Sequence, residues 1–282
     1  MSRIYQIGTF DGGGVHGVGV LKLLTRLYID TNNEVYFSGY AGTSTGSIIA
    51  VCLAMGMPPY KILDLYIRLG NKIFSKRNWN PKAPKYSNKP LIKELKEIFG
   101  AGKMCDIQHP VYIGYSDFQE KKTRVFDRSN NIEIWRAVLI SCSAPTFFEP
   151  IDNRYCDGGL ILQNPSFAGA TGFAREKKVS LKNISVLSFG TNGKTNSKIK
   201  IKKTMWLWDW AIAIIKFALQ GSESLSTFYC EQAGLHSHKR LEPYFDKEYK
   251  MDNPKNMPLF MEVWDLYYDT ERTDLINFLN ND

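Results

Sequence analysis

Two short segments hold a serine and an aspartate in settings that favour acyl-transfer chemistry. Residues 42–46 read GTSTG, a G-x-S-x-G pattern with Ser44 at its centre. Glycines on both sides relieve crowding on a tight strand-to-helix turn, which exposes the serine oxygen as a nucleophile. A helix that starts at this turn directs its amide groups and positive dipole end at any anion formed there. The pattern therefore predicts Ser44 as a nucleophile.

A serine nucleophile needs a base, and the sequence offers two solutions. Asp157 opens the turn 157–159, DGG, from which a carboxylate can accept the Ser44 proton directly. A carboxylate is a weak base unless a dry site raises its pKa. The alternative is a Ser-Asp-His triad in the chain order of α/β-hydrolases, written Ser44, Asp157 and His236. Only one predicted strand precedes the serine strand, which argues against the triad. A DGG turn is also common without any function.

Residues 12–17, GGGVHG, formally match the dinucleotide fingerprint G-x-G-x-x-G. That fingerprint also needs an acidic residue at the end of the second strand. The acidic residues near the required spacing, Asp30 and Glu34, precede the second predicted strand. A dinucleotide site is therefore a weak hypothesis, and we expect neither a cofactor nor a metal ion.

The elements that position these residues follow from the spacing of apolar side chains. Strands are predicted at residues 4–10, 36–41, 111–118, 123–127 and 183–190, and helices at 15–30, 47–55, 60–74, 89–99 and 132–141. Strands that alternate with helices indicate an α/β layered fold. No linker divides the chain, so we predict a single domain over residues 1–282 with a helical, basic elaboration at about 57–105.

Composition excludes several classes of protein. The chain has 44% hydrophobic and 23% charged residues, which excludes disorder, collagen and coiled coil as overall descriptions. We expect no secretory signal and no membrane span. Its five cysteines form no CxxC pair, so reduced thiols and a cytoplasmic location are expected.

The excess of positive charge, +8 overall, lies mainly in two segments. The first contains Lys72, Lys76, Arg77, Lys82, Lys85, Lys89 and Lys93 without an acidic residue, and the second contains Lys194, Lys198, Lys200, Lys202 and Lys203. Both indicate a polyanionic partner, either anionic lipid or nucleic acid. No nucleic-acid motif is present, so we expect no polymer of that kind. The segment 206–219, which begins WLWDW, is either an interfacial helix or a helix packed on the sheet.

Taken together, the blocks DGGGVHG, GTSTG and DGG, in this order, resemble the signature of patatin-like phospholipases. SAPTFF at 143–148, Asn164-Pro165 and SFGT at 188–191 also resemble segments of that family. The resemblance covers about residues 4–230. It implies a three-layer fold with a central mixed β-sheet flanked by helices. It also implies Ser44 as nucleophile, Asp157 as its direct base, and an oxyanion hole from backbone N–H groups around Gly12, Gly13 and Gly14.

The activity implied by this resemblance is hydrolysis of fatty-acyl esters in membrane glycerophospholipids, through an acyl-enzyme and with peripheral attachment to the membrane. Compact bacterial enzymes of this kind include antiphage effectors that a cyclic oligonucleotide switches on. The basic segment 72–93 is where such an activator would bind. One position departs from the family, which usually has arginine where this chain has His16. The resemblance implies no oligomeric state.

Overall fold

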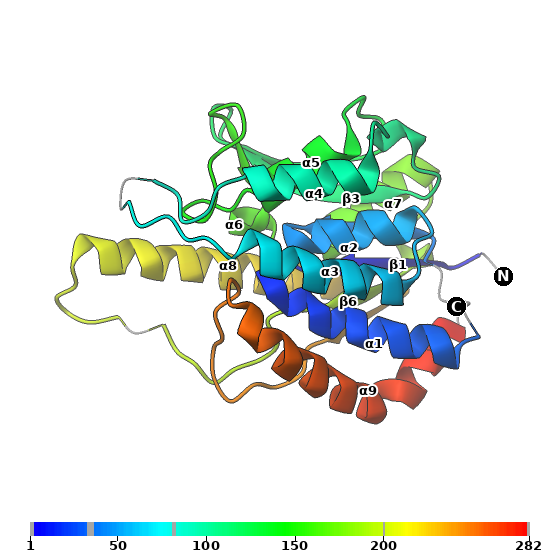
Figure 1. The fold of residues 1–282 in the computed structure, drawn as a ribbon. Coiled ribbons are helices and arrows are strands. Elements are labelled where there is room, and N and C mark those ends of the chain that lie inside the picture. The colour runs from blue at the N-terminus through cyan, green and yellow to red at the C-terminus, as the bar shows by residue number, and fades with distance from the viewer. Residues whose placement is uncertain (1–2, 33–36, 81–82, 200, 281–282) are drawn as a thin grey trace.

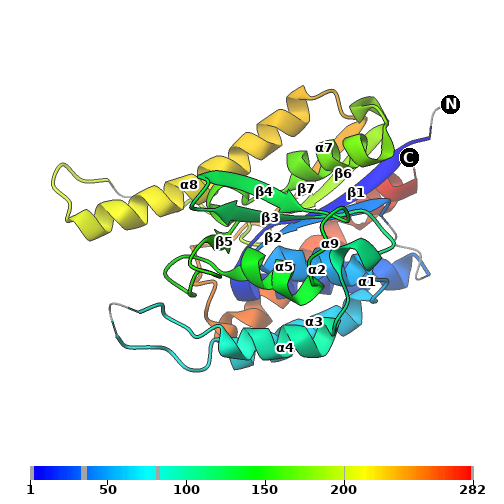
Figure 2. The ribbon, with the colours of Figure 1, turned by 90° about the horizontal axis from the view of Figure 1, so that it is seen from above.

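A mixed β-sheet forms the centre of the molecule (Figures 1 and 2). The computed structural model describes residues 3–32, 37–80, 83–199 and 201–280. Within these residues the sheet has seven strands, in the order β4-β3-β2-β1-β6-β7, and β5 also pairs with β3. The strands are β1 (Tyr5–Phe10), β2 (Gly39–Thr43), β3 (Val111–Asp117), β4 (Lys122–Phe126), β5 (Tyr155–Asp157), β6 (Ile184–Phe189) and β7 (Ser237–Leu241). β4 and β5 run antiparallel to β3, and the other neighbours are parallel.

Helices cover both faces of the sheet (Figure 2). One face carries α1 (Gly17–Asp30), α2 (Thr45–Ala54), α3 (Pro59–Ile73), α4 (Lys89–Phe99), α5 (Ile134–Cys142) and α9 (Met257–Asn280). The short α6 (Gly159–Leu162) leads to the other face, which carries α7 (Ser166–Lys177) and α8 (Leu207–Gln232). Short 3-10 turns are η1 (Gly14–His16), η2 (Met104–Asp106), η3 (Leu181–Asn183) and η4 (Pro254–Asn256). The predicted three-layer α/β fold is confirmed.

The larger core lies between the sheet and the helices that cover the face with α1 and α9. The fully buried Trp264 of α9 packs against Gly19 of α1, where an added Cβ would lie 2.0 Å from the indole. Glycine at this position lets the two helices approach, and burial of a side chain as large as Trp264 stabilises the fold by several kcal/mol, on the order of 25 cal/mol per Å². A smaller core, around Phe173 of α7, fills the opposite face.

Most predicted elements between residues 4 and 190 are confirmed, with ends shifted by one to three residues. The predicted strand 36–41 begins at Tyr36, which lies outside the described residues, and the strand itself occupies Gly39–Thr43. Sequence periodicity missed β5, β7, α6, α7 and α9. β5 and α6 are too short to show a period, and β7 (SHKRL) is polar although it pairs with β6.

The parallel strands all end at one edge of the sheet, and that edge positions the chemistry. β1 leads into Gly12, β2 leads into Ser44, and β6 leads towards Thr191. Because β1 lies between β2 and β6, these three turns are neighbours in space. Ligands of open α/β sheets bind at this carboxyl edge.

Candidate active site

Ser44 occupies a strained turn between β2 and α2. Its backbone has φ 54° and ψ −132°, in a region that costs a non-glycine residue about 1–3 kcal/mol. Two glycines make this turn sterically feasible. A Cβ on Gly42 would lie 2.4 Å from the Gly46 carbonyl oxygen. A Cβ on Gly46 would lie 2.3 Å from the Phe10 carbonyl oxygen. Ser44 therefore lies at the amino end of α2, in the backbone geometry of a nucleophile elbow.

Asp157, at the end of β5, lies close enough to Ser44 for the serine side chain to influence the pKa of its carboxyl. Only 4% of Asp157 is exposed. Burial raises the pKa of its carboxyl from 3.8 to about 7, although the Ser44 side chain and the hydrogen bond from the Gly159 N–H oppose this shift. The Gly159 bond is 2.7 Å long. The fold thus brings together the two residues predicted from sequence, and burial makes this carboxylate more basic than an ordinary aspartate.

Ser141, which sequence analysis did not single out, holds the nucleophile turn in place. Its hydroxyl accepts a 3.0 Å hydrogen bond from the Ser44 N–H and donates a 2.7 Å bond to the Gly114 carbonyl oxygen of β3. Nearby, the Asp157 N–H donates to the Ser143 carbonyl oxygen at 3.0 Å. One helix end, α5, therefore supports both candidate residues. The only sequence signal for Ser141 is its position just before the SAPTFF segment.

The glycine loop after β1 passes directly beside the nucleophile. A Cβ on Gly12 would lie 2.9 Å from the Ser44 Cβ. The Gly12 carbonyl oxygen accepts hydrogen bonds from the Gln163 amide at 2.6 Å and from the Thr191 hydroxyl at 2.5 Å. These two bonds fix the loop. Gln163 is another residue that sequence analysis passed over, next to the Asn164-Pro165 pair.

The backbone donors of this loop differ in availability. The Gly12 N–H faces the Gln163 carbonyl oxygen at 3.4 Å, a long hydrogen bond. The N–H groups of Gly13 and Gly14 have no acceptor among the residues that the structure describes. Gly14 has φ +58°, and a Cβ there would lie 2.1 Å from the Met251 carbonyl oxygen, so only glycine fits. An oxyanion hole formed by all three glycines stays a prediction.

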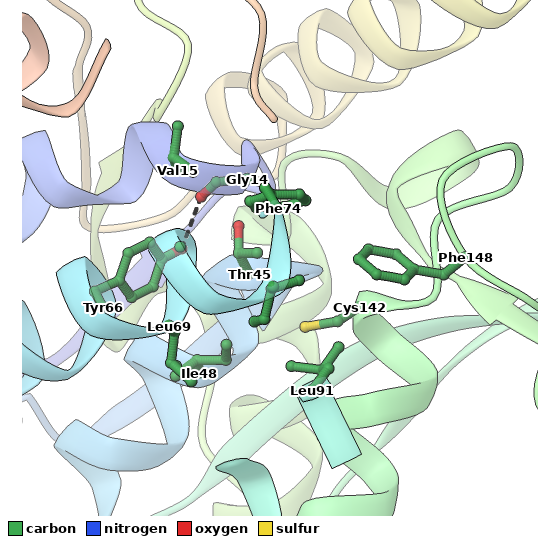
Figure 3. Close-up of a pocket in the computed structure, with 12 residues that line it drawn as sticks. Gly14, Val15, Thr45, Ile48, Tyr66, Leu69, Phe74, Leu91, Cys142 and Phe148 are labelled. Carbon is green, nitrogen blue, oxygen red and sulfur yellow. Dashed lines mark hydrogen bonds between the residues drawn. The ribbon is translucent and has the colours of Figure 1, made fainter. Parts of the chain in front are cut away.

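An apolar pocket lies between the helices of the α1 face, and Thr45, the residue after Ser44, lines it (Figure 3). The space in it that a water-sized molecule can occupy is about 30 Å³. Its walls are Gly14, Val15, Thr45, Ile48, Tyr66, Leu69, Gly70, Ile73, Phe74, Leu91, Cys142 and Phe148. The Tyr66 hydroxyl does not face the pocket as a free donor, because it donates to the Gly14 carbonyl oxygen at 3.2 Å. Burial raises the pKa of the Cys142 thiol, which stays neutral. The walls of the pocket are almost entirely apolar.

The triad hypothesis is wrong on geometric grounds. His236 lies at the start of β7, where its N–H donates to the Ile184 carbonyl oxygen at the start of β6. This is the amino edge of the sheet, whereas Ser44 lies at the carboxyl edge, and β7 is three places from β2. His238 pairs with Val186 in the middle of β6, on the same strand three places from β2. Neither histidine can accept the Ser44 proton.

His16, at the position where arginine is usual in the resembling family, is a buried neutral ring. It stacks on Phe260 with ring centroids 3.9 Å apart, and its Nδ1 lies 3.0 Å from the Asn192 Oδ1. Burial lowers its pKa to about 4, so it carries no charge at pH 7. His16 therefore packs the loop but offers no cation to a phosphate.

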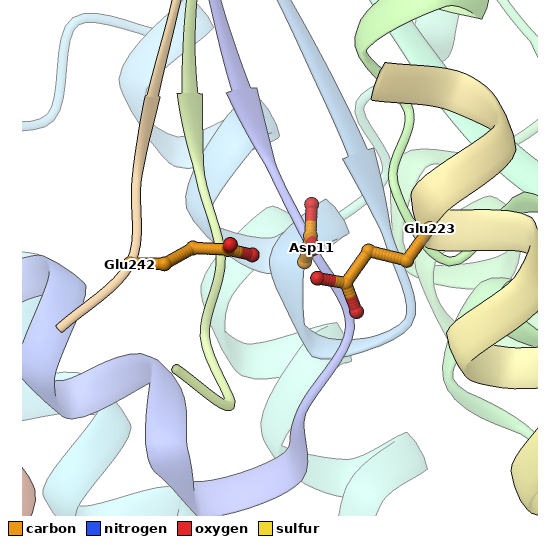
Figure 4. Close-up of side chains that lie close together, drawn as sticks. All are labelled: Asp11, Glu223 and Glu242. Carbon is orange, nitrogen blue, oxygen red and sulfur yellow. The ribbon is translucent and has the colours of Figure 1, made fainter. Parts of the chain in front are cut away.

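Three carboxylates, from Asp11, Glu223 and Glu242, gather behind the glycine loop with oxygens within 4.8 Å of one another (Figure 4). Arg240 pairs with all three, at 2.6 Å to Asp11 and 2.7 Å to Glu223. Burial raises the pKa of Asp11 to about 6 and that of Glu223 further above its ordinary value. Since the guanidinium already supplies a cation, we interpret this cluster as a structural tie between β1, β7 and α8.

The basic segment 72–93 is partly neutralised by acidic residues from elsewhere in the chain. Lys72 pairs with Glu94 at 2.5 Å, and Lys85 pairs with Asp252 of the loop before η4. Lys82 lies outside the described residues.

All five cysteines are free, as expected from their spacing, and only Cys105 is exposed.

Known proteins of similar sequence include phospholipases. The chain is 28% identical over 235 residues to a cGAMP-activated phospholipase of Vibrio cholerae, covering 68% of this chain and 65% of that protein. It is 28% identical over 174 residues to an intracellular phospholipase A2 of Caenorhabditis elegans, covering 56% of this chain and 16% of that protein. Among solved structures, VipD from Legionella pneumophila aligns at a TM-score of 0.40 with 12% identity, over 69% of this chain and 52% of VipD.

The chain thus spans 16% to 65% of the length of these two curated relatives. A family model described as patatin-like phospholipase matches residues 8–168, a region that contains the glycine loop, Ser44 and Asp157. This match covers more than half of the chain. The chain belongs to the patatin-like phospholipase family.

Proposed function

We propose that this protein is a lipid acyl hydrolase in which Ser44 is the nucleophile and Asp157 its direct base. The observation that carries the proposal is the position of Ser44, on its strained turn, beside a buried carboxyl whose pKa burial raises to about 7. Asp157 accepts the Ser44 proton as Oγ attacks the ester carbonyl carbon. Collapse of the tetrahedral intermediate breaks the ester bond, and the leaving alcohol takes the proton from Asp157.

A water molecule completes the cycle. Asp157 accepts one of its protons as the water attacks the acyl-enzyme, and release of the fatty acid returns that proton to Ser44. The negative oxygen of both intermediates is stabilised by the N–H groups of Gly13 and Gly14 and by the amino end of α2. A preorganised donor of this kind contributes about 3 kcal/mol to the transition state. The Gly12 N–H takes part only if it leaves its long bond to Gln163.

The substrate class follows from the walls of the pocket. Apolar side chains such as Leu69, Phe74 and Phe148 bind a fatty-acyl chain rather than a polar group. Phospholipases are the relatives of this chain, so we propose membrane glycerophospholipid as the substrate. Such an enzyme attaches peripherally to the membrane, and its free thiols suit the cytoplasm.

The test is hydrolysis of a chromogenic medium-chain ester and of phospholipid vesicles. Ser44→Ala and Asp157→Asn should each lower kcat by at least a thousandfold while the fold is retained. The matched control is the double variant His236→Ala/His238→Ala, which should keep wild-type activity. Full activity in the Ser44 or Asp157 variant, or loss of activity in the histidine variant with an intact fold, would overturn the proposal.

A second candidate adds regulation to the same activity. The relative from Vibrio cholerae is a cGAMP-activated phospholipase, and we propose that a cyclic oligonucleotide activates this chain as well, in antiphage defence. Lys76 and Lys89 are exposed and form no ion pair within the described part of the chain, so they are free to bind phosphate.

Esterase rates measured with and without cyclic di- and trinucleotides test this candidate. Activation should occur in the wild type and disappear in Lys76→Ala/Lys89→Ala. It should persist in Lys177→Ala/Lys182→Ala, a pair of exposed lysines at the end of α7 and in η3. If no nucleotide changes the rate and calorimetry detects no binding, the candidate fails.

A further inference from the structure

The amino-terminal half of α8 projects from the body of the protein (Figures 1 and 2). The carboxyl-terminal half is anchored, because the hydroxyls of Ser222 and Ser226 accept hydrogen bonds from the N–H groups of Gln163 and Phe167. The sequence of residues 206–219 is compatible with a helix packed on the sheet and with an interfacial helix. In the structure only the carboxyl-terminal half of α8 packs on the body, and the amino-terminal half stays exposed.

The projecting half carries an apolar stripe that faces solvent. Leu207, Ile214 and Phe217 are 85%, 60% and 69% exposed, and Trp210 is 40% exposed. Their spacing of three, four and three residues places them on one face of the helix. Such a face is normally buried, so its exposure indicates a contact surface. No helix of the described residues is both long and apolar enough to cross a membrane, which leaves a contact along the surface.

Positive charge precedes the stripe. Residues 191–206 contain five lysines and no acidic residue, although Lys200 lies outside the described residues. Lys198, Lys202 and Lys203 are exposed. The segment ends at Trp206, whose side chain is 84% exposed. Lysines next to tryptophan and aliphatic side chains match the two layers of an anionic bilayer surface, phosphate above and hydrocarbon below.

A second element projects in the same direction as the start of α8, at the carboxyl edge of the sheet (Figures 1 and 2). This is the loop between α3 and α4, where Trp79 is 82% exposed and the Arg77 guanidinium lies 5.0 Å from its ring centroid. On the α8 side, Leu219 lies next to Gly159, which follows Asp157 by two residues. A Cβ on Gly159 would lie 3.7 Å from the Leu219 side chain. α8 therefore reaches the neighbourhood of the candidate active site two residues after the stripe ends at Phe217.

We propose that the exposed stripe of α8, Leu207, Trp210, Ile214 and Phe217, lies in the interface of an anionic bilayer and delivers lipid to Ser44. The inference deepens the proposed function and rests on it for the identity of the substrate. A second copy of this chain fits the surface less well, because it would bring another lysine-rich segment of the same charge to the same face.

Sedimentation with vesicles tests the surface separately from the chemistry. The variant Leu207→Ser/Ile214→Ser should bind vesicles of mixed anionic and zwitterionic lipid at least tenfold more weakly than the wild type. The matched control is Leu266→Ser/Ile29→Ser, whose side chains are 63% and 64% exposed on α9 and α1. The control should bind within twofold of the wild type. Binding of the wild type should weaken in purely zwitterionic vesicles and at high salt.

Hydrolysis of a soluble short-chain ester, which needs no interface, should be equal in the wild type and both double variants, and this also shows that they fold. Ser44→Ala should bind vesicles as the wild type does. The test of membrane binding by α8 is therefore independent of the catalytic proposal. Equal vesicle binding by the α8 variant and the wild type would overturn the inference. A wild-type dimer that the α8 variant alone abolishes, without vesicle binding, would assign the surface to a second copy instead.

Discussion

Replacing Asp157 with asparagine should stabilise the folded protein at pH 8 and at the same time remove its hydrolytic activity. Burial raises the pKa of this carboxyl from 3.8 to about 7. Between these values the folded state holds a proton that the unfolded state has released. The free energy of unfolding therefore falls by about 1.4 kcal/mol for each pH unit in this window. Across the whole window the proton on Asp157 contributes about 4 kcal/mol to the free energy of unfolding. This contribution is complete below pH 4 and lost above pH 7.

The experiment compares urea unfolding of the wild type and of Asp157→Asn at pH 5 and pH 8. Asparagine carries no proton that titrates, and it can still accept the Gly159 hydrogen bond. Only the two pH units between 5 and 7 contribute to the comparison. The stability of the variant relative to the wild type should therefore increase by about 3 kcal/mol from pH 5 to pH 8. Other titrating groups cancel because both proteins contain them.

Asp117 provides the control, because its environment lowers the pKa of its carboxyl instead of raising it. Hydrogen bonds from Arg154 lower its pKa to about 2, so it is ionised at both pH values. Asp117→Asn should lower stability by the same amount at pH 5 and pH 8. If the stability difference for Asp157→Asn changes by less than about 0.5 kcal/mol, the carboxyl has an ordinary pKa and the direct-base reasoning fails. The wild-type kcat/KM should rise with pH and level off above about 7, because only the ionised carboxyl accepts a proton.

Three further substitutions test the geometry around Ser44. Gly12→Ala places a Cβ 2.9 Å from the Ser44 Cβ, so kcat should fall by about a hundredfold in ester hydrolysis; a loss below threefold would contradict this. Ser141→Ala leaves the Ser44 N–H without its partner, which should cost about 1–3 kcal/mol in urea unfolding and lower kcat; unchanged values of both would show that Ser141 is dispensable. Leu69→Trp fills the pocket, so KM should rise for long-chain esters and stay constant for acetate esters; equal effects on both would refute an acyl pocket there.

Local sequence determined the parts of this protein that depend on a few neighbouring residues. The glycines of GTSTG specify the strained turn of Ser44, because side chains at Gly42 and Gly46 would collide with backbone. Apolar periodicity predicted α3 and α4 almost to the residue, since each helix buries one face. The spaced glycine and serine blocks also pointed to the family before any fold was known. These features are readable because their physical cause lies within one turn or one element.

Tertiary structure decided everything that depends on which distant elements meet. The pairing of Ser44 with Asp157 needs β5 beside β3, and the pKa of Asp157 comes from burial there. Ser141 and Gln163 gained their roles through contacts that no local pattern encodes. The basic segment 72–93 looked free of acidic residues until folding brought Asp252 to Lys85, whereas α8 kept its apolar stripe exposed because only its second half packs on the body. Burial and charge pairing are properties of three-dimensional neighbours, and the linear order of residues does not contain them.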